Sequence, residues 1–85
     1  MRSTARLELY VVGRPGDAPV DAAATLHDLQ GRRVATLFRG ALPRGLTALR
    51  WDGRDDRGLA LASGTYFLRF TSPLATRVTR VIRVR

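Results

Sequence analysis

Three carboxylates gather in the segment Asp52-Gly-Arg-Asp-Asp-Arg-Gly58, at Asp52, Asp55 and Asp56. Carboxylate oxygens are the ligands that Ca²⁺ prefers, so the cluster is the first candidate for a metal site. The spacing does not suit a calcium loop. If Asp52 is its first position, Arg54 occupies the third position and Ser63 stands where a bidentate Glu is needed.

The same segment is rich in Arg, with Arg50, Arg54 and Arg57 beside or between the carboxylates. Guanidinium groups can neutralise carboxylates by charge-assisted hydrogen bonds. Asp side chains followed by Gly also favour turns in which the carboxylate accepts from backbone amides. The pattern therefore favours a turn that is capped and ion-paired over a metal site, and it implies no cofactor.

The chain contains few residues that could act in catalysis, since it has one His, three Ser and no Cys. His27 is expected on a strand, facing away from the side that Leu26 buries, where a lone His is normally solvated or hydrogen-bonded. The sequence offers neither a nucleophile with a base nor a phosphate-binding glycine loop. We expect no catalytic residue, no enzyme activity and no small-molecule substrate.

The basic charge is the strongest feature of the composition, because all fifteen cationic residues are Arg and the net charge is +8. We predict an interaction surface on the last strand, with Tyr10 and Phe67 as exposed aromatic partners. Its basic members are Arg77, Arg80, Arg83 and Arg85. Binding of a polyanion or nucleic acid is the alternative function. Against it, Arg is spread over every segment and no helix could enter a groove, so the basicity also fits a bias of composition.

Alternating apolar and polar residues predict extended segments separated by Gly-rich turns. The expected strands cover residues 7–11, 20–27, 33–38, 47–51, 59–62, 65–71 and 75–85. The strand over residues 20–27 is the least secure of these, because it is rich in Ala, which is a weak strand former.

The spacing of the last segment fits a helix as well as a strand, since Arg77, Arg80 and Arg83 lie three residues apart. Its many β-branched residues favour the strand. Strict alternation would place Arg80 on the same face as Val78 and Ile82, so we predict a β-bulge near Arg80.

These segments predict an all-β fold, an antiparallel immunoglobulin-like β-sandwich of about seven short strands. Trp51 and Tyr66 are its large core residues, and the Tyr66 hydroxyl is expected to fasten its strand by a hydrogen bond. The expected core consists of Leu7, Leu9, Val11, Leu26, Val34, Leu37, Leu49, Trp51, Tyr66, Leu68, Phe70, Val78 and Ile82.

Length limits the chain to one small core, so we predict a single domain over residues 1–85. Without Cys it depends on packing and hydrogen bonds. The apolar stretch 7–12 is too short for a signal peptide, and no run approaches the length of a membrane span. If the chain acts outside the cytoplasm, its export signal belongs to a longer parent chain or has been removed.

Four motifs in this order resemble the Ig-like domain of the flagellar hook-capping protein (FlgD type). They are Leu26-His-Asp-Leu-Gln-Gly-Arg-Arg-Val-Ala-Thr-Leu37, Leu42-Pro-Arg-Gly45, Trp51-Asp-Gly-Arg-Asp-Asp-Arg-Gly58 and Ala62-Ser-Gly-Thr-Tyr-Phe67. The resemblance is strongest over residues 20–85.

The resemblance implies a non-catalytic structural or interaction module. Such modules are reused as C-terminal accessory domains of secreted or surface bacterial proteins, in assembly, anchoring or sorting. An extracellular or cell-surface location as part of a larger exported chain follows from it. Open strand edges would bind a protein partner or a second copy.

Overall fold

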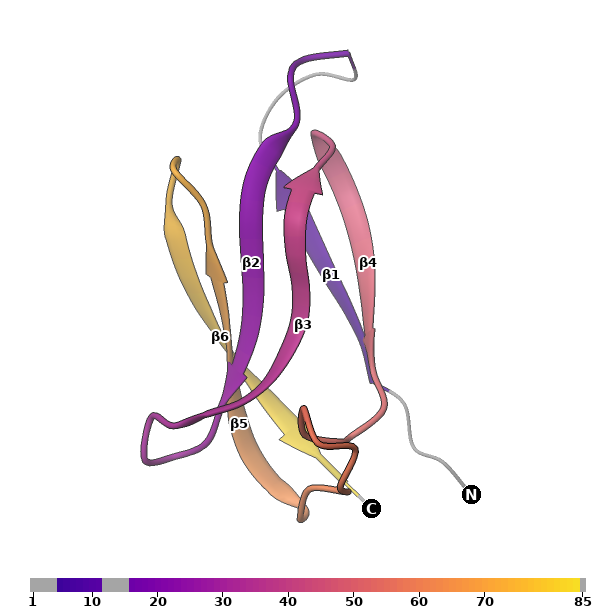
Figure 1. Cartoon of the computed structure of the whole chain (residues 1–85), viewed down its shortest axis with the longest axis vertical. Helices are drawn as coiled ribbons and strands as arrows, with labels where there is room; N and C mark the ends of the chain where they lie inside the picture. Colours follow the sequence, from indigo (N-terminus) through magenta and orange to yellow (C-terminus); the bar gives the residue numbers. More distant parts are fainter. Residues whose placement is uncertain (1–4, 12–15, 85) are drawn as a thin grey trace.

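The computed structural model describes residues 5–11 and 16–84, and it describes side chains from residue 16 onward. Its six strands are shown in Figure 1: β1 (Ala5–Val11), β2 (Val20–His27), β3 (Arg33–Leu42), β4 (Gly45–Trp51), β5 (Gly64–Thr71) and β6 (Thr76–Arg83). Every strand pairing is antiparallel. The described residues contain no helix, so the prediction of an all-β antiparallel fold is confirmed.

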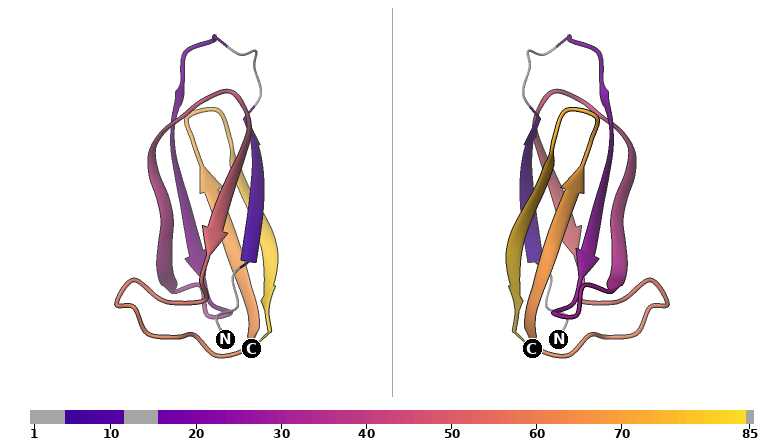
Figure 2. Two further views of the ribbon diagram at one scale, coloured as in Figure 1. Left: turned by 90° about the vertical axis from the view of Figure 1, so that its right-hand side faces the viewer. Right: turned by 90° about the vertical axis from the view of Figure 1, so that its left-hand side faces the viewer.

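One open sheet has the order β3-β2-β5-β6, and β1 pairs with β4 separately. Figure 2 shows the β1–β4 pair in front of the sheet in one view and behind it in the opposite view. Residues 59–62 do not form the predicted strand, and only an isolated bridge joins Arg54 to Ala60. Within residues 5–11 and 16–84, the structure has no helix with the length and apolarity that crossing a membrane would require.

The Ala-rich strand β2 lies at the centre of the sheet, between β3 and β5. Ala24 is fully buried, and Ala35 is nearly so. These small side chains share one cluster with Trp51 and Tyr66, where they leave room for the two rings. Packing therefore overrides the weak strand propensity of Ala.

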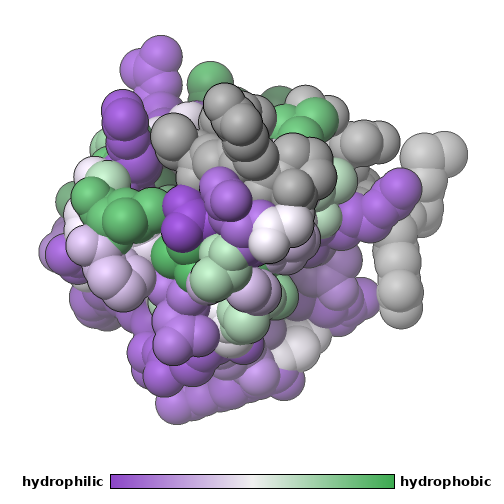
Figure 3. Space-filling view, turned by 90° about the horizontal axis from the view of Figure 1, so that it is seen from above, coloured by the Kyte–Doolittle hydropathy of each residue, from purple (hydrophilic) through white to green (hydrophobic). Residues whose placement is uncertain are grey.

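Two clusters of buried side chains form the core. The larger one joins the sheet to β4 and contains Ala24, Leu26, Ala35, Trp51, Tyr66, Leu68 and Val81. The smaller one contains Val20, Ala22 and Leu42, and Phe38 packs against both clusters. The smaller cluster lies toward the end of the molecule that faces the viewer in Figure 3. The surface of that end is mostly hydrophilic, with smaller hydrophobic areas.

The expected core is partly confirmed. Leu26, Trp51, Tyr66 and Leu68 are buried, and Val34, Leu37, Leu49 and Phe70 are partly buried and pack against the clusters. The side chains of Leu7, Leu9 and Val11 lie outside the described residues.

The prediction for β6 was wrong in two respects. The β5–β6 register is continuous from Gly64 opposite Arg83 to Thr71 opposite Thr76, so there is no bulge near Arg80. Without a bulge, Val81 faces the core, whereas Val78 and Ile82 are 61% and 63% exposed. The register shifts occur between β2 and β3 instead.

Candidate interaction surface

The carboxylate segment forms a loop after β4 that its own side chains hold in shape. Asp52 accepts a hydrogen bond from the Arg54 amide at 3.1 Å, and its carboxylate lies 3.9 Å from the Arg54 Nε. The Asp55 carboxylate accepts from the amides of Arg57 and Leu59 at 2.9 and 3.0 Å. The predicted capping of backbone amides is confirmed, while ion pairing within the described loop is limited to Asp52 and Arg54.

Asp56 acts outside its own loop, because it binds the backbone of β3. Its carboxylate accepts from the Thr36 amide at 2.8 Å, and its amide donates to the Val34 carbonyl at 3.1 Å. This pair of hydrogen bonds resembles the contact of a neighbouring strand. Asp56 therefore covers part of the outer edge of β3.

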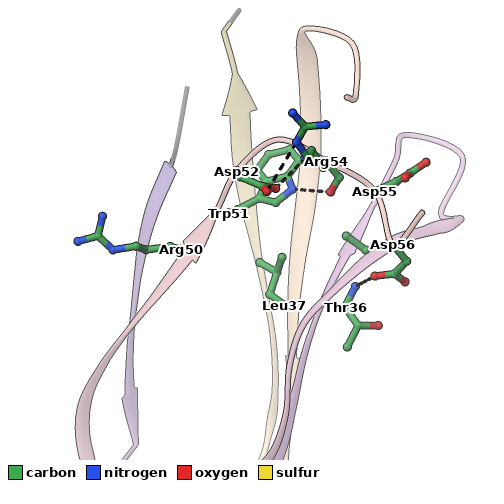
Figure 4. A pocket seen from close by; sticks show the side chains of 9 residues that line it. Thr36, Leu37, Arg50, Trp51, Asp52, Arg54, Asp55 and Asp56 are labelled. Atoms are coloured by element: carbon green, nitrogen blue, oxygen red, sulfur yellow. Dashed lines mark hydrogen bonds and ion pairs between the residues drawn. The ribbon is translucent and has the colours of Figure 1, made fainter. Parts of the chain in front are cut away.

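A hollow of about 380 Å³ lies between β3, β4 and this loop. In Figure 4, Arg50 points away from the other labelled side chains, and Asp56 reaches to Thr36. The Trp51 indole N–H donates to the Arg54 carbonyl at 3.1 Å. The three carboxylates do not converge, and among the described residues no group of three or more His, Cys, Asp or Glu could hold a metal ion.

A second turn, after β2, is held by Asp28. Its carboxylate accepts from the amides of Gln30 and Arg32 and from the Arg32 Nε, at 2.9 to 3.0 Å. Desolvation raises the pKa of Asp28, but these hydrogen bonds and the Arg32 charge outweigh it, so the pKa lies below the usual 3.8. Gly31 supplies the expected positive φ, at 84°.

His27 is hydrogen-bonded, as expected of a lone His on a strand. Its Nδ1 lies 3.3 Å from the Gly31 carbonyl, and its Nε2 lies 2.9 Å from the Thr25 hydroxyl. In the neutral ring, Nδ1–H donates to the carbonyl and Nε2 accepts from the hydroxyl. The ring thus links the turn after β2, through Gly31, to the strand itself, through Thr25.

Strict alternation in β6 divides the predicted Arg surface between two faces. Arg83 turns inward: its Nε donates to the Leu61 carbonyl at 2.9 Å, and its guanidinium lies over the Trp51 ring. Arg77 falls on the same alternation as Arg83 but is exposed, and Arg80 falls on the opposite one. Arg77, Arg80 and Arg83 therefore do not form one stripe.

The outer face of the sheet keeps one part of the predicted surface together. Phe67 is half-buried there, directly between Arg80 on β6 and His27 on β2. Arg85 and the Tyr10 side chain lie outside the described residues.

Two hydrogen bonds of Asp56 and Arg83 were not predicted from the sequence. The bond that Asp56 accepts from Thr36 spans 20 residues, and the bond that Arg83 donates to Leu61 spans 22. No local pattern encodes such separations. Gly53 lies against Arg83, where a Cβ would overlap the guanidinium, but in the sequence it is indistinguishable from the other turn glycines.

The fold and these sites define an all-β module in which the polar side chains of the loops stabilise the turns by hydrogen bonds to the backbone. The family model of the FlgD Ig-like domain matches residues 12–73, and the chain belongs to this family. It is accordingly a non-catalytic module. The match begins before the expected residue 20 and ends before β6. Comparisons with curated proteins and with solved structures gave no match.

Proposed function

We propose that the chain is a non-catalytic immunoglobulin-like sandwich, a single domain over residues 1–85, that serves an exported or surface-exposed bacterial protein in assembly, anchoring or sorting. Membership of the FlgD Ig-like family is the observation that carries this proposal. The two strand layers, joined by Trp51 in one core cluster, are consistent with a sandwich.

The module works mechanically in this proposal. Two of its loops are held in shape by their own side chains, at Asp28 and Asp55, as a load-transmitting module would require. Open strand edges then offer the backbone groups through which a protein partner or a second copy can add a strand. No small-molecule substrate is involved.

The test uses the complete parent protein with an epitope tag at the far end from this module. Three forms are compared: the natural protein, a form lacking the module, and a form with Trp51→Ala. This substitution leaves a cavity in the core and is expected to lower the free energy of unfolding by about 3–5 kcal/mol. Of these three forms, we expect only the natural protein to lose its tag when intact cells are treated with protease. The matched control, Arg57→Ala in the exposed part of the loop, should behave as the natural protein. Equal surface exposure of all forms would refute a role in sorting or anchoring.

Binding of a polyanion is the second candidate, favoured by the Arg content and by exposed Arg77 and Arg80. Its test is the affinity for heparin and for DNA at about 50 and 200 mM salt. Affinity that disappears at the higher salt would indicate non-specific attraction, whereas salt-resistant binding that depends on DNA sequence would establish this function.

A further inference from the structure

The two edges of the four-stranded sheet differ. β3 forms one edge and β6 the other. The β3 edge is protected, because its pairing with β2 contains two register shifts and Asp56 binds its backbone at Val34 and Thr36. Bulges and covering loops are the usual means by which proteins prevent an edge from accepting a further strand.

The β6 edge has neither protection. Its register with β5 is unbroken over eight residue pairs, and within residues 5–11 and 16–84 no other strand pairs with it. In an antiparallel edge strand, alternate residues direct their N–H and C=O groups away from the neighbouring strand. Arg83 ties the end of β6 to the loop at Leu61, so the open part of the edge is Thr76–Ile82.

The side chains along this open edge combine two kinds of chemistry. Val78 and Ile82 expose apolar surface on the outer face, on either side of Arg80. Arg77 and Arg80 are exposed, and no described carboxylate pairs with either. An added strand would meet two cations three residues apart, Arg80 on the outer face between the two apolar residues and Arg77 on the opposite face.

We propose that β6 accepts an extended, acidic segment of a partner protein as a fifth strand of this sheet. The partner places carboxylates opposite Arg77 and Arg80 and apolar side chains opposite Val78 and Ile82. Main-chain hydrogen bonds supply affinity, and the spacing of the carboxylates supplies specificity. This inference rests on the proposed role as an interaction module and specifies its partner.

A second copy of the chain fits the same edge poorly. Antiparallel pairing of two β6 strands centred on Arg80 places Arg80 opposite Arg80 and Arg77 opposite Arg83. Like charges directly opposite one another destabilise strand pairs. Each copy also carries a net charge of +8, which adds repulsion.

A nucleic acid would use only part of the edge. Phosphates can bind Arg77 and Arg80, but they neither complete the backbone ladder nor cover Val78 and Ile82. The described aromatic side chains also give little stacking surface, because Phe67 is half-buried.

The experiment titrates the isotope-labelled 85-residue chain with a capped peptide, Ser-Val-Thr-Glu-Thr-Val-Glu-Ser, at about 50 mM salt. Run antiparallel to β6, its two Glu residues fall opposite Arg80 and Arg77, and its two Val residues fall opposite Ile82 and Val78. One control peptide has Lys in place of Glu. Another is methylated on alternate backbone nitrogens, which removes donors without changing the charge.

We expect the largest amide shift changes in Thr76–Ile82. The Lys peptide and the methylated peptide should bind the natural chain at least about tenfold more weakly than the Glu peptide does, and the Glu peptide should lose the same factor on the Arg77→Glu/Arg80→Glu variant. The matched control, Arg33→Glu/Arg39→Glu on β3, has the same net charge and should bind within about twofold of the natural chain.

Several results would overturn the proposal. The methylated peptide could bind as tightly as the unmethylated one, or the β3 control variant could weaken binding as much as the β6 variant. The shift changes could instead centre on β3 or on β1 and β4. Ultracentrifugation could also show a dimer, as expected of β6–β6 pairing. An oligothymidylate that displaces the peptide at about 200 mM salt would instead assign β6 to a polyanion. If the peptide fails while the parent protein still needs the module at the cell surface, this inference alone is wrong.

Discussion

The guanidinium of Arg83 lies over the indole ring of Trp51, with Cζ 5.8 Å from the ring centroid. The same indole meets the Tyr66 ring edge-on, at 5.5 Å and 72°. Arg83 is at the end of β6 and Trp51 at the end of β4, so this stack joins the four-stranded sheet to the β1–β4 pair. Arg83, which was predicted to belong to an interaction surface, thus links the two strand layers of the fold.

Replacement of Arg83 by Met should lower the free energy of unfolding by about 1–2 kcal/mol, because it removes the contact with Trp51 and the hydrogen bond to Leu61. Urea unfolding followed by Trp fluorescence measures the change. Arg80→Met, on the outer face, is the control and should stay within about 0.5 kcal/mol of the natural chain. Equal effects of the two substitutions would show that the Arg83 stack adds nothing to stability.

Gly53 should tolerate Ala worse than Gly58 does. The two residues have φ of 80° and 84°, so both substitutions strain the backbone, by about 1 kcal/mol. A Cβ on Gly58 meets open space, whereas one on Gly53 overlaps the Arg83 guanidinium. Thermal unfolding should therefore show a larger loss for Gly53→Ala. In a double-mutant cycle, Gly53→Ala with Arg83→Met should cost less than the sum of the two, and strict additivity would argue against this contact.

The Tyr66 hydroxyl fastens β5 to the preceding segment by donating to the Ala62 carbonyl at 2.7 Å. Tyr66→Phe keeps the ring against Trp51 and removes only this bond, so we expect a loss of about 1 kcal/mol in urea unfolding. Tyr66→Leu, which also removes the ring contact, should cost more. Unchanged stability of Tyr66→Phe would mean that the hydroxyl does not fasten the strand.

Local patterns predicted the fold well where one face of a strand is buried. Alternation gave β2, β4 and β5 nearly at their observed bounds, because buried and exposed residues there alternate without interruption. It failed on β6. Arg83 is half-buried against Trp51, so the inward face carries an Arg while Val78 and Ile82 face outward. On β6 only Val81 is buried, and Arg83 occupies the next inward position, so assuming apolar residues inside produced a bulge that does not exist.

Asp28 should make stability depend on pH in the acid range. Its pKa is lowered in the folded chain, so the ionised carboxylate stabilises the fold. This contribution is complete above the unfolded pKa, near 3.8, and is lost as the pH falls through the lower, folded value. Unfolding measured from about pH 6 to pH 2 should show the natural chain losing stability more steeply than Asp28→Asn. Identical slopes would show that Asp28 does not contribute.

Asp56 should control access to the β3 edge. Asp56→Ala removes the acceptor of the Thr36 amide, so hydrogen exchange at Thr36 should become faster and the free energy of unfolding should fall by about 1–2 kcal/mol. Asp56→Asn retains an acceptor oxygen and should come close to the natural chain. Asp52→Ala removes a cap within the loop itself and is the matched control, expected to leave exchange at Thr36 unchanged. If Asp56→Ala leaves the Thr36 amide as protected as before, the carboxylate does not guard this edge. The contrast with the open edge of β6 would then lose one of its two supports, leaving only the register shifts between β2 and β3.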